Sequence, residues 1–289
     1  MKSFAYKFLL ALLCLGWAGP LAAQNKEQMS VALSSPGKPG VLHLKLVGGS
    51  ITVAGYSGKE VLIEAAPRSS GSRAGRPPGP PGPPSGPTPP TGGPEGGGMR
   101  RLSQVQGMDI TAQEKNNHVY VNSDSWQRPI DFTVKVPRQF SLQVSTVNSG
   151  DILVQNVAGE LEISNVNGSI SLDDVAGSAV VSTVNGRVVA SFRDVTPNAP
   201  MAFSSVNGKL DVTLPAKTKA AFKLKSDRGE IYSDFDMAVD ASAPKVNRSS
   251  KDGVYRVSTD NWTYGKINGG GAEVMMQTMN GNIYIRKAK

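Results

Sequence analysis

The residue types that most often carry catalysis or bind metal ions are scarce in this sequence. It has two histidines, His43 and His118, and one cysteine, Cys14, in 289 residues. One cysteine excludes a disulfide framework and a thiolate zinc cluster, and two histidines leave little for a histidine metal site. His43 lies on the polar side of a segment in which apolar and polar residues alternate, and His118 precedes a second strand-like segment. Both are therefore interpreted as surface residues. The sequence predicts no catalytic residue, metal site or cofactor.

Two patterns resemble catalytic sites but lack the context that such sites need. Ser35 and Lys38 have the spacing of a Ser-x-x-Lys nucleophile, yet they lie in a Pro/Gly-rich stretch where no helix can set them on one face. A carbohydrate-cleaving β-helix would instead gather charged residues on an outer face, here Glu160, Glu162, Asp173, Asp174, Asp211 and Arg187. Charges on the solvent side of strands also provide solubility, which is the preferred explanation.

Three aromatic residues are the candidates for binding. Trp126, Trp262 and Tyr264 lie outside the regular strand-like segments, where aromatic side chains stack on sugars or contact a partner. A packed cap over the end of the fold is the alternative, and the sequence favours it.

The charge pattern indicates one class of partner. The formal net charge is +8, and the densest basic pairs are Lys217 with Lys219, Lys223 with Lys225, and Arg286 with Lys287. Basic residues otherwise stand singly among acidic ones. This distribution favours weak contact with anionic envelope polymers over binding to nucleic acid.

The first 23 residues predict a cleaved secretory signal peptide. Lys2 and Lys7 precede an apolar run, Gly19-Pro20 breaks it, and Ala22-Ala23 supplies small residues for cleavage. The apolar run is shorter than the roughly 20 residues of a spanning helix, and no later segment is long enough either. We therefore expect a mature chain without a transmembrane segment, either periplasmic or secreted to the cell surface.

Residues 67–99 predict a disordered insertion. They hold 11 of the 20 prolines and 10 of the 32 glycines. Proline removes hydrogen-bond donors and glycine loosens the backbone, so this segment cannot join a sheet or bury a core. Strand-like sequence on both sides indicates one domain, formed by residues 24–66 and 100–289.

A repeat of nine residues determines the expected fold. Glycines at 150, 159, 168, 177 and 186 are each followed by alternating apolar residues at plus two and plus four, and a third apolar residue stands at plus seven in each of the first four units. Polar residues separate the apolar ones, which is typical of strands with one buried face.

Two kinds of corner alternate, so the full unit has 18 residues. Val-Asn-Gly occurs at 166–168 and 184–186, and Val-Ala-Gly at 157–159 and 175–177. This favours an all-β fold, a β-solenoid in which each turn of chain stacks on the last. Asn-Gly also forms hairpin turns, so an antiparallel meander is the alternative, although it gives no reason for the 18-residue alternation. We expect positive φ at these corners, which Asn and Gly tolerate.

The same pattern extends over most of the chain and resembles a known family. Residues 49–58 (Gly-Ser-Ile-Thr-Val-Ala-Gly-Tyr-Ser-Gly), a third Val-Asn-Gly at 206–208 and the closing Met-Asn-Gly-Asn-Ile at 279–283 are similar to the bacterial β-strand-repeat family of unknown function often labelled putative adhesin. The resemblance covers about residues 40–66 and 100–289. It implies an envelope-associated β-solenoid and supplies no functional residue.

These observations together predict a non-catalytic protein of the bacterial cell envelope. We expect an adhesion, binding or structural module whose partner is an envelope polysaccharide or another envelope protein. One alternative is a carbohydrate-active β-helix enzyme, in which alanine at both Asp173 and Asp174 would abolish activity. Another is a subunit of a larger envelope assembly, paired through exposed strand edges.

Overall fold

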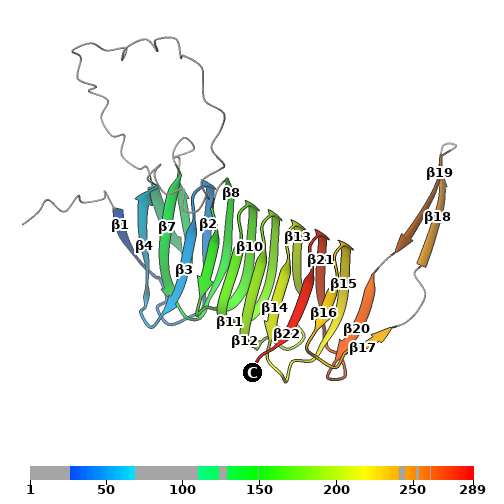
Figure 1. Ribbon diagram of the computed structural model, residues 1–289. Coiled ribbons are helices and arrows are strands. Elements are labelled where there is room, and N and C mark those ends of the chain that lie inside the picture. The colour runs from blue at the N-terminus through cyan, green and yellow to red at the C-terminus, as the bar shows by residue number, and fades with distance from the viewer. Residues whose placement is uncertain are drawn as a thin grey trace, which may run out of the picture.

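The computed structural model describes residues 27–68, 110–123, 129–148, 150–240, 245–251, 254–260 and 262–289. Within these ranges every regular element is a strand, so the all-β prediction is confirmed. Twenty strands form one continuous hydrogen-bonded sheet that is bent into two faces (Figure 1). The remaining two, β18 (Lys245–Lys251) and β19 (Val254–Asp260), pair antiparallel with each other.

Neighbouring strands on each face come from distant parts of the sequence. In spatial order the first face consists of β5 (Ile110–Lys115), β6 (His118–Ser123), β2 (Gly40–Gly48), β8 (Phe140–Asn148), β10 (Ala158–Asn167), the second half of β11 (Ile170–Asn185), β13 (Met201–Asn207), β21 (Ala272–Asn280), β15 (Ala220–Arg228), β20 (Thr263–Ile267) and β17 (Ala238–Asp240). The second face consists of β1 (Glu27–Ala32), β4 (Glu60–Pro67), β7 (Ile130–Pro137), β3 (Ile51–Tyr56), β9 (Ile152–Gln155), the first half of β11, β12 (Val188–Val195), β14 (Leu210–Leu214), β22 (Ile283–Lys287) and β16 (Ile231–Ser233).

Parallel pairing in register confirms the β-solenoid in the regular repeats. Ile152 pairs with Ile170 on the second face, and Asn167 pairs with Asn185 on the first. Equivalent residues of successive turns therefore lie beside each other, which an antiparallel meander does not allow.

The core lies between the two faces and is filled by the alternating apolar residues. Ile152, Ile163, Leu172 and Val181 are all 0–1% exposed. Phe192 on the second face meets Phe203 on the first edge-to-face, with ring centroids 6.2 Å apart. Strands from before and after residues 67–99 contribute to this single apolar cluster. The core therefore joins the two segments.

The prediction for the plus-seven position is wrong at the Asn-Gly corners. Val157 and Val175 are buried, but Val166 is only half-buried and Val184 is 38% exposed. Alternation within the strand continues to the corner, so the residue before each of these valines faces inward. At these positions a buried polar side chain donates a hydrogen bond to the glycine carbonyl of the turn before, as in Asn165 to Gly150 (2.8 Å) and Thr183 to Gly168 (3.0 Å).

The asparagines of the Asn-Gly corners form a ladder along one edge of the stack. Asn185 donates to the side-chain oxygen of Asn167 (2.9 Å), Asn207 to that of Asn185 (2.8 Å) and Asn280 to that of Asn207 (2.7 Å). Each amide thus donates to the turn before it. The ladder explains why asparagine recurs at the same place in each unit.

The glycines of these corners are needed for space, and the prediction of positive φ there is wrong. None of Gly168, Gly186 and Gly208 has a positive φ, whereas Gly177 of a Val-Ala-Gly corner has a φ of 116°. A Cβ added to Gly186 would lie 2.0 Å from the carbonyl oxygen of Gly168, and one on Gly208 would lie 1.9 Å from that of Gly186. Successive corners therefore pack backbone against backbone.

Turns do not stack in sequence order at either end, contrary to the expected winding. The turn β2–β3 lies between β6–β7 and β8–β9, and the last turn, β21–β22, lies between β13–β14 and β15–β16 (Figure 1). Each inserted turn is held by parallel pairing on both sides. All strands share the same inward alternation, so the pattern by itself does not fix their order.

Antiparallel strands cover three of the four ends of the two faces. β5 covers β6, β4 and β1 cover β7, and β20 and β17 cover β15. A further turn of the solenoid cannot pair in parallel with an antiparallel strand, so such a strand ends the parallel stack. It also covers the edge of the last parallel strand.

Several predictions concern residues that the structure does not describe. The leader, residues 1–23, lies outside the described residues, and so does most of the Pro/Gly-rich insertion. Pro67, expected to begin that insertion, is instead the last residue of β4. In the described part of the chain, no helix has the length and apolar character that crossing a membrane requires.

Candidate functional site

Two of the three aromatic candidates lie together on the outer side of the first face. Trp262 precedes β20, whereas Tyr264 lies within this strand, contrary to the prediction, and is 41% exposed. The ammonium group of Lys223 lies 4.6 Å from the centre of the Trp262 ring, and that of Lys225 lies 5.8 Å from it. Trp126 lies outside the described residues. The aromatics therefore flank the capping strand and meet lysines of β15.

The lysines and aromatics form a continuous surface, which we call the tryptophan strip. Lys223 and Tyr264 are direct cross-strand neighbours. Inward-facing Ala220, Phe222 and Leu224 alternate with the outward-facing residues of β15. Six residues make up the strip: Lys219, Lys223, Lys225, Trp262, Tyr264 and Lys266. From Lys219 to Lys225 the strip is about 20 Å long.

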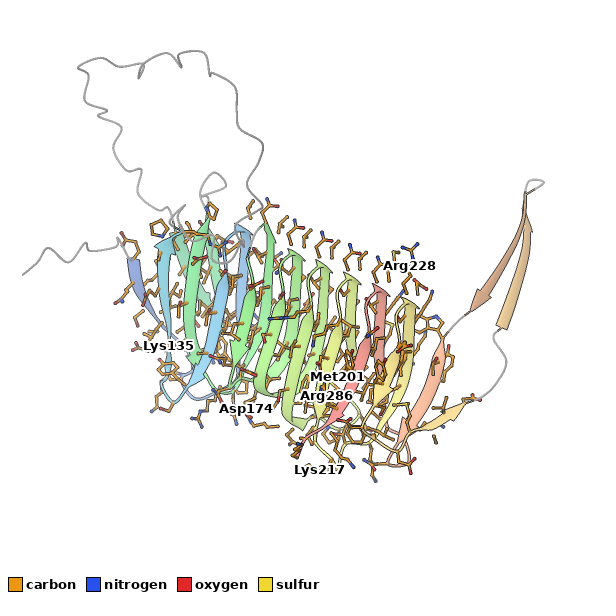
Figure 2. The ribbon with its side chains drawn as sticks, in the orientation of Figure 1. Lys135, Asp174, Met201, Lys217, Arg228 and Arg286 are labelled. Carbon is orange, nitrogen blue, oxygen red and sulfur yellow. The ribbon has the colours of Figure 1, made fainter. Side chains whose placement is uncertain are left out.

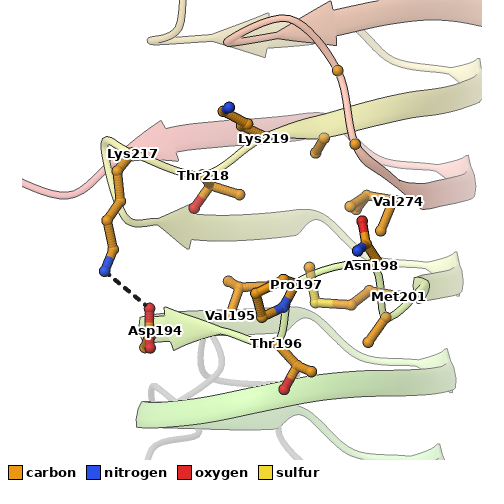
Figure 3. Close-up of a pocket in the computed structure, with 15 residues that line it drawn as sticks. Asp194, Val195, Thr196, Pro197, Asn198, Met201, Lys217, Thr218, Lys219 and Val274 are labelled. Atoms are coloured by element: carbon orange, nitrogen blue, oxygen red, sulfur yellow. Dashed lines mark ion pairs between the residues drawn. The ribbon is translucent and has the colours of Figure 1, made fainter.

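A hollow of about 400 Å³ lies at the start of the strip, at the corner where β13, β21 and β15 begin. Figure 3 shows Lys217 reaching across it to Asp194, with a nitrogen–oxygen distance of 3.4 Å. Thr218 and Asn198 supply polar groups, and Met201 lies among the apolar lining residues. Lys219 lines the hollow and also begins the strip, so the two features are continuous.

The inserted turn explains why this hollow exists. In the regular repeats a short corner joins each strand of the second face to the next turn. Here the chain leaves β14 and passes over one turn to reach β15, because β21 occupies the position between β13 and β15. β21 is entered instead from β20, through Gly269, Gly270 and Gly271. Three loops therefore surround the start of β21. Figure 2 shows Asp174 and Lys217 at this edge of the stack and Arg228 at the other.

The acidic residues considered for a carbohydrate-cleaving site are not gathered at one place. Glu160 and Glu162 are on β10, on the first face, whereas Asp211 is on β14, on the second. Asp174 has a positive φ of 50° at an irregularity of β11, where Arg193 pairs with it. In the described ranges no group of three or more His, Cys, Asp or Glu is placed to hold a metal ion.

Asp211 is held in an ion-pair network that sequence spacing did not reveal. Arg286, from the inserted strand β22, donates to it at 2.6 and 3.2 Å, and Lys209 at 3.1 Å. Burial raises the pKa of Asp211, but these hydrogen bonds and positive charges outweigh it and hold the pKa below the usual aspartate value. Arg286 and Asp211 are far apart in sequence, so only the pairing of β14 with β22 brings them together.

Replacing Asp211 with asparagine is expected to lower the free energy of unfolding at neutral pH by about 1–2 kcal/mol. The folded-state pKa is lowered, so the unfolded chain binds the proton more readily in acid. The stabilisation is thus present above the usual aspartate pKa of about 3.9 and is lost as the pH falls through the lower folded-state value. Urea unfolding of the protein and the variant at several pH values measures this.

The exposed pair Asp194–Lys217 provides the control for this prediction. Its side chains are 62% and 79% exposed, compared with 11% for Asp211. Asp194→Asn should change the free energy of unfolding by less than about 0.5 kcal/mol. A difference between Asp211→Asn and the unmodified protein that stays constant from pH 7 to strong acid would contradict the assigned network.

Comparison with known proteins identifies the family of the solenoid. Residues 141–286, from β8 to β22, match the family described as Toastrack DUF4097. The chain belongs to this family. The Toastrack region includes both regular and inserted turns, and the match confirms the resemblance to an adhesin-like β-repeat family of unknown function. A search of curated proteins found no match. A crystal structure of a putative cell adhesion protein from Clostridium sporogenes aligns with 91% of this chain and 99% of its own, at 11% identity and a TM-score of 0.46.

The two histidines are the feature that sequence reasoning missed. His43 on β2 and His118 at the start of β6 lie on the outer side of the first face, with His43 Nε2 3.1 Å from His118 Nδ1. Burial, followed by the charges of His118 and Lys45, lowers the pKa of His43; its hydrogen bond with Gln143 and the charge of Glu162 act in the opposite direction. No short-range motif signals this pair.

Proposed function

We propose that this protein is an exported, non-catalytic binding module of the cell envelope, which holds an anionic polymer along the tryptophan strip. The observation that carries this proposal is the contact of Lys223 and Lys225 with the Trp262 ring. The ring keeps two positive charges close together on a partly desolvated surface, where an anionic group binds more strongly than at a freely moving lysine.

The solenoid supports binding of this kind because its strands hold the side chains in fixed rows. Lys223 and Lys225 lie on β15, which Lys219 directly precedes, and Lys266 and Tyr264 lie on the next strand, about 4.8 Å away. A repeating acidic polymer can contact several of these groups at once, and many weak contacts add to a useful affinity. The exposed Tyr264 offers a face on which a sugar ring can stack.

Acidic residues beside the tryptophan strip limit its affinity for anions. Asp227 pairs with Lys225 at 3.4 Å, and Glu273 lies opposite Ala221 on β21. These charges keep the strip from binding every anion tightly. We therefore expect affinity to depend on a polymer that spans several lysines, and to fall as salt screens the charges.

Export follows from the leader predicted at residues 1–23. With the leader present, the protein should appear in the periplasmic or extracellular fraction, shortened at about Ala23. A form without residues 2–23 should stay in the cytoplasm. A full-length protein that remains cytoplasmic would contradict export but would leave the binding proposal unaffected.

The binding proposal is tested with immobilised polygalacturonate, an acidic polysaccharide, and with dextran, an uncharged one. The mature protein should bind polygalacturonate in a salt-dependent manner and dextran much more weakly. Replacing Lys223 and Lys225 together with glutamine should weaken binding by at least about tenfold, equivalent to about 1.4 kcal/mol. Trp262→Ala should have a similar effect because the lysines lose their common contact.

The control removes the same charge elsewhere. Lys45 and Lys135 are exposed lysines on strands at the opposite end of the stack. Replacing both with glutamine gives the same net charge as the strip variant, so binding should stay within about twofold of the unmodified protein. Equal losses in the two double variants would show that only the net charge matters, and the strip would be rejected.

A further inference from the structure

The chain has two histidines, and the fold brings both of them into contact. β2 and β6 pair parallel, with Val41 opposite His118 and His43 opposite Tyr120. His43 and His118 are therefore diagonal neighbours on the outer side of the first face. The Tyr120 ring stacks on His43 with centroids 4.4 Å apart and planes 6° apart, so it supports the imidazole on one face.

The two facing nitrogens point at each other. The ring centroids are 5.4 Å apart and the planes differ by 15°. The distance between the two ring centroids is longer than the 3.1 Å between the two nitrogens, and the difference equals about two imidazole ring radii. Both nitrogens therefore lie on the line that joins the ring centroids. In the neutral pair one of these two nitrogens carries a hydrogen and donates a hydrogen bond to the other.

A metal-binding histidine pair also needs a hydrogen-bond partner for the ring and space for the ion, and the surroundings of His43 and His118 provide both. Gln143 on β8 lies directly opposite His43, where its side-chain amide can reach a ring nitrogen of His43. A metal-bound histidine commonly uses its second nitrogen for a hydrogen bond of this kind. A hollow of about 400 Å³ lies over the pair, and its lining includes Gln143, Glu160 and Glu162. The two carboxylates lie on β10, the second strand from β2.

We propose that His43 Nε2 and His118 Nδ1 bind one late divalent transition-metal ion, such as Zn²⁺ or Cu²⁺, on the outer side of the first face. Metal–imidazole bonds of about 2.0 Å at a tetrahedral ion place two ligand nitrogens about 3.3 Å apart, close to the separation already present. Both rings must tilt so that their lone pairs meet at the ion. Imidazole is a preferred ligand of these ions, and water from the open hollow completes the coordination.

Binding requires a rearrangement of one proton. The proton held between the two nitrogens moves to the other nitrogen of its own ring, through solvent, so that both facing nitrogens present a lone pair. The neutral pair thus releases no net proton.

The first test titrates Zn²⁺ into the mature protein at neutral pH by calorimetry. One ion should bind per chain, and His43→Ala and His118→Ala should each weaken binding by at least about tenfold. Tyr120→Phe keeps both nitrogens and the stacked ring, so it should bind as the unmodified protein does. His43→Gln retains a polar side chain at the same place and should bind no better than His43→Ala. Far-ultraviolet circular dichroism of each variant shows that the fold is intact.

The second test uses Cu²⁺ and reads the ligands directly. The electron paramagnetic resonance spectrum should show coupling to two imidazole nitrogens in the unmodified protein and to one in either alanine variant. A protein that binds neither ion, or an affinity that is unchanged when both histidines are replaced, would overturn the proposal. A spectrum with a single nitrogen in the unmodified protein would also overturn it.

Discussion

Replacing Leu172 with alanine is expected to lower the free energy of unfolding by about 2–5 kcal/mol. Leu172 is fully buried, and its neighbours in the stack are Val154 of the turn before and Ala190 of the turn after. Because all three side chains face the core from one row, a cavity at Leu172 cannot be closed by a small movement of the strand. Chemical denaturation of the mature protein, followed by circular dichroism, measures the change.

Ser171 supplies the matched control, since it is the residue before Leu172 on the same strand. It is half-buried and faces outward, next to Leu153 and Val189. Ser171→Ala should change the free energy of unfolding by less than about 0.5 kcal/mol. If the two substitutions had equal effects, the assignment of inward and outward residues on β11 would be wrong.

Replacing Gly186 with alanine is expected to destabilise the protein by about 3 kcal/mol, although it adds a single methyl group. The added Cβ would lie 2.0 Å from the carbonyl oxygen of Gly168 and 2.5 Å from its carbonyl carbon. Both atoms belong to the backbone, so the strain cannot be relieved by turning a side chain. The two turns have to separate, which weakens the hydrogen bond from Ile170 N to Arg187 O nearby.

Asn185, the residue before Gly186, separates this steric effect from the loss of the ladder. Asn185→Ala removes one hydrogen bond to Asn167 and one from Asn207, but the side chain is exposed and water can replace both. It should cost about 1 kcal/mol. Thermal unfolding that ranks Asn185→Ala as more damaging than Gly186→Ala would contradict the close packing of the corners.

The inward face of the regular repeats could be predicted from the sequence because alternation of period two is a local property. Ile152, Ile163, Leu172 and Val181 are predicted and buried. The prediction of a buried side chain was wrong at Val166 and Val184, because it was based on the nine-residue spacing and not on the alternation within the strand. At those corners the inward residue is Asn165 or Thr183, whose hydrogen bond to a glycine carbonyl requires a neighbouring turn.

The candidate site was predicted only in part. Trp262 and Tyr264 stood out because they lie outside the repeats, and Lys223 and Lys225 because they are close in sequence. That these four residues share one surface depends on the antiparallel pairing of β15 with β20. The hollow beside them depends on β21 being inserted between β13 and β15, which no sequence pattern indicated.

The sequence by itself determined the strands of the regular repeats, their buried sides away from the Asn-Gly corners and the 18-residue turn, because these depend on which residues lie two, nine and 18 positions apart. Only the tertiary structure decided the order of the turns at the two ends, and with it the pairing of Arg286 with Asp211 and of His43 with His118. The physical reason is that turns with the same alternation present equivalent edges. Which edges meet is settled by packing and by the capping strands.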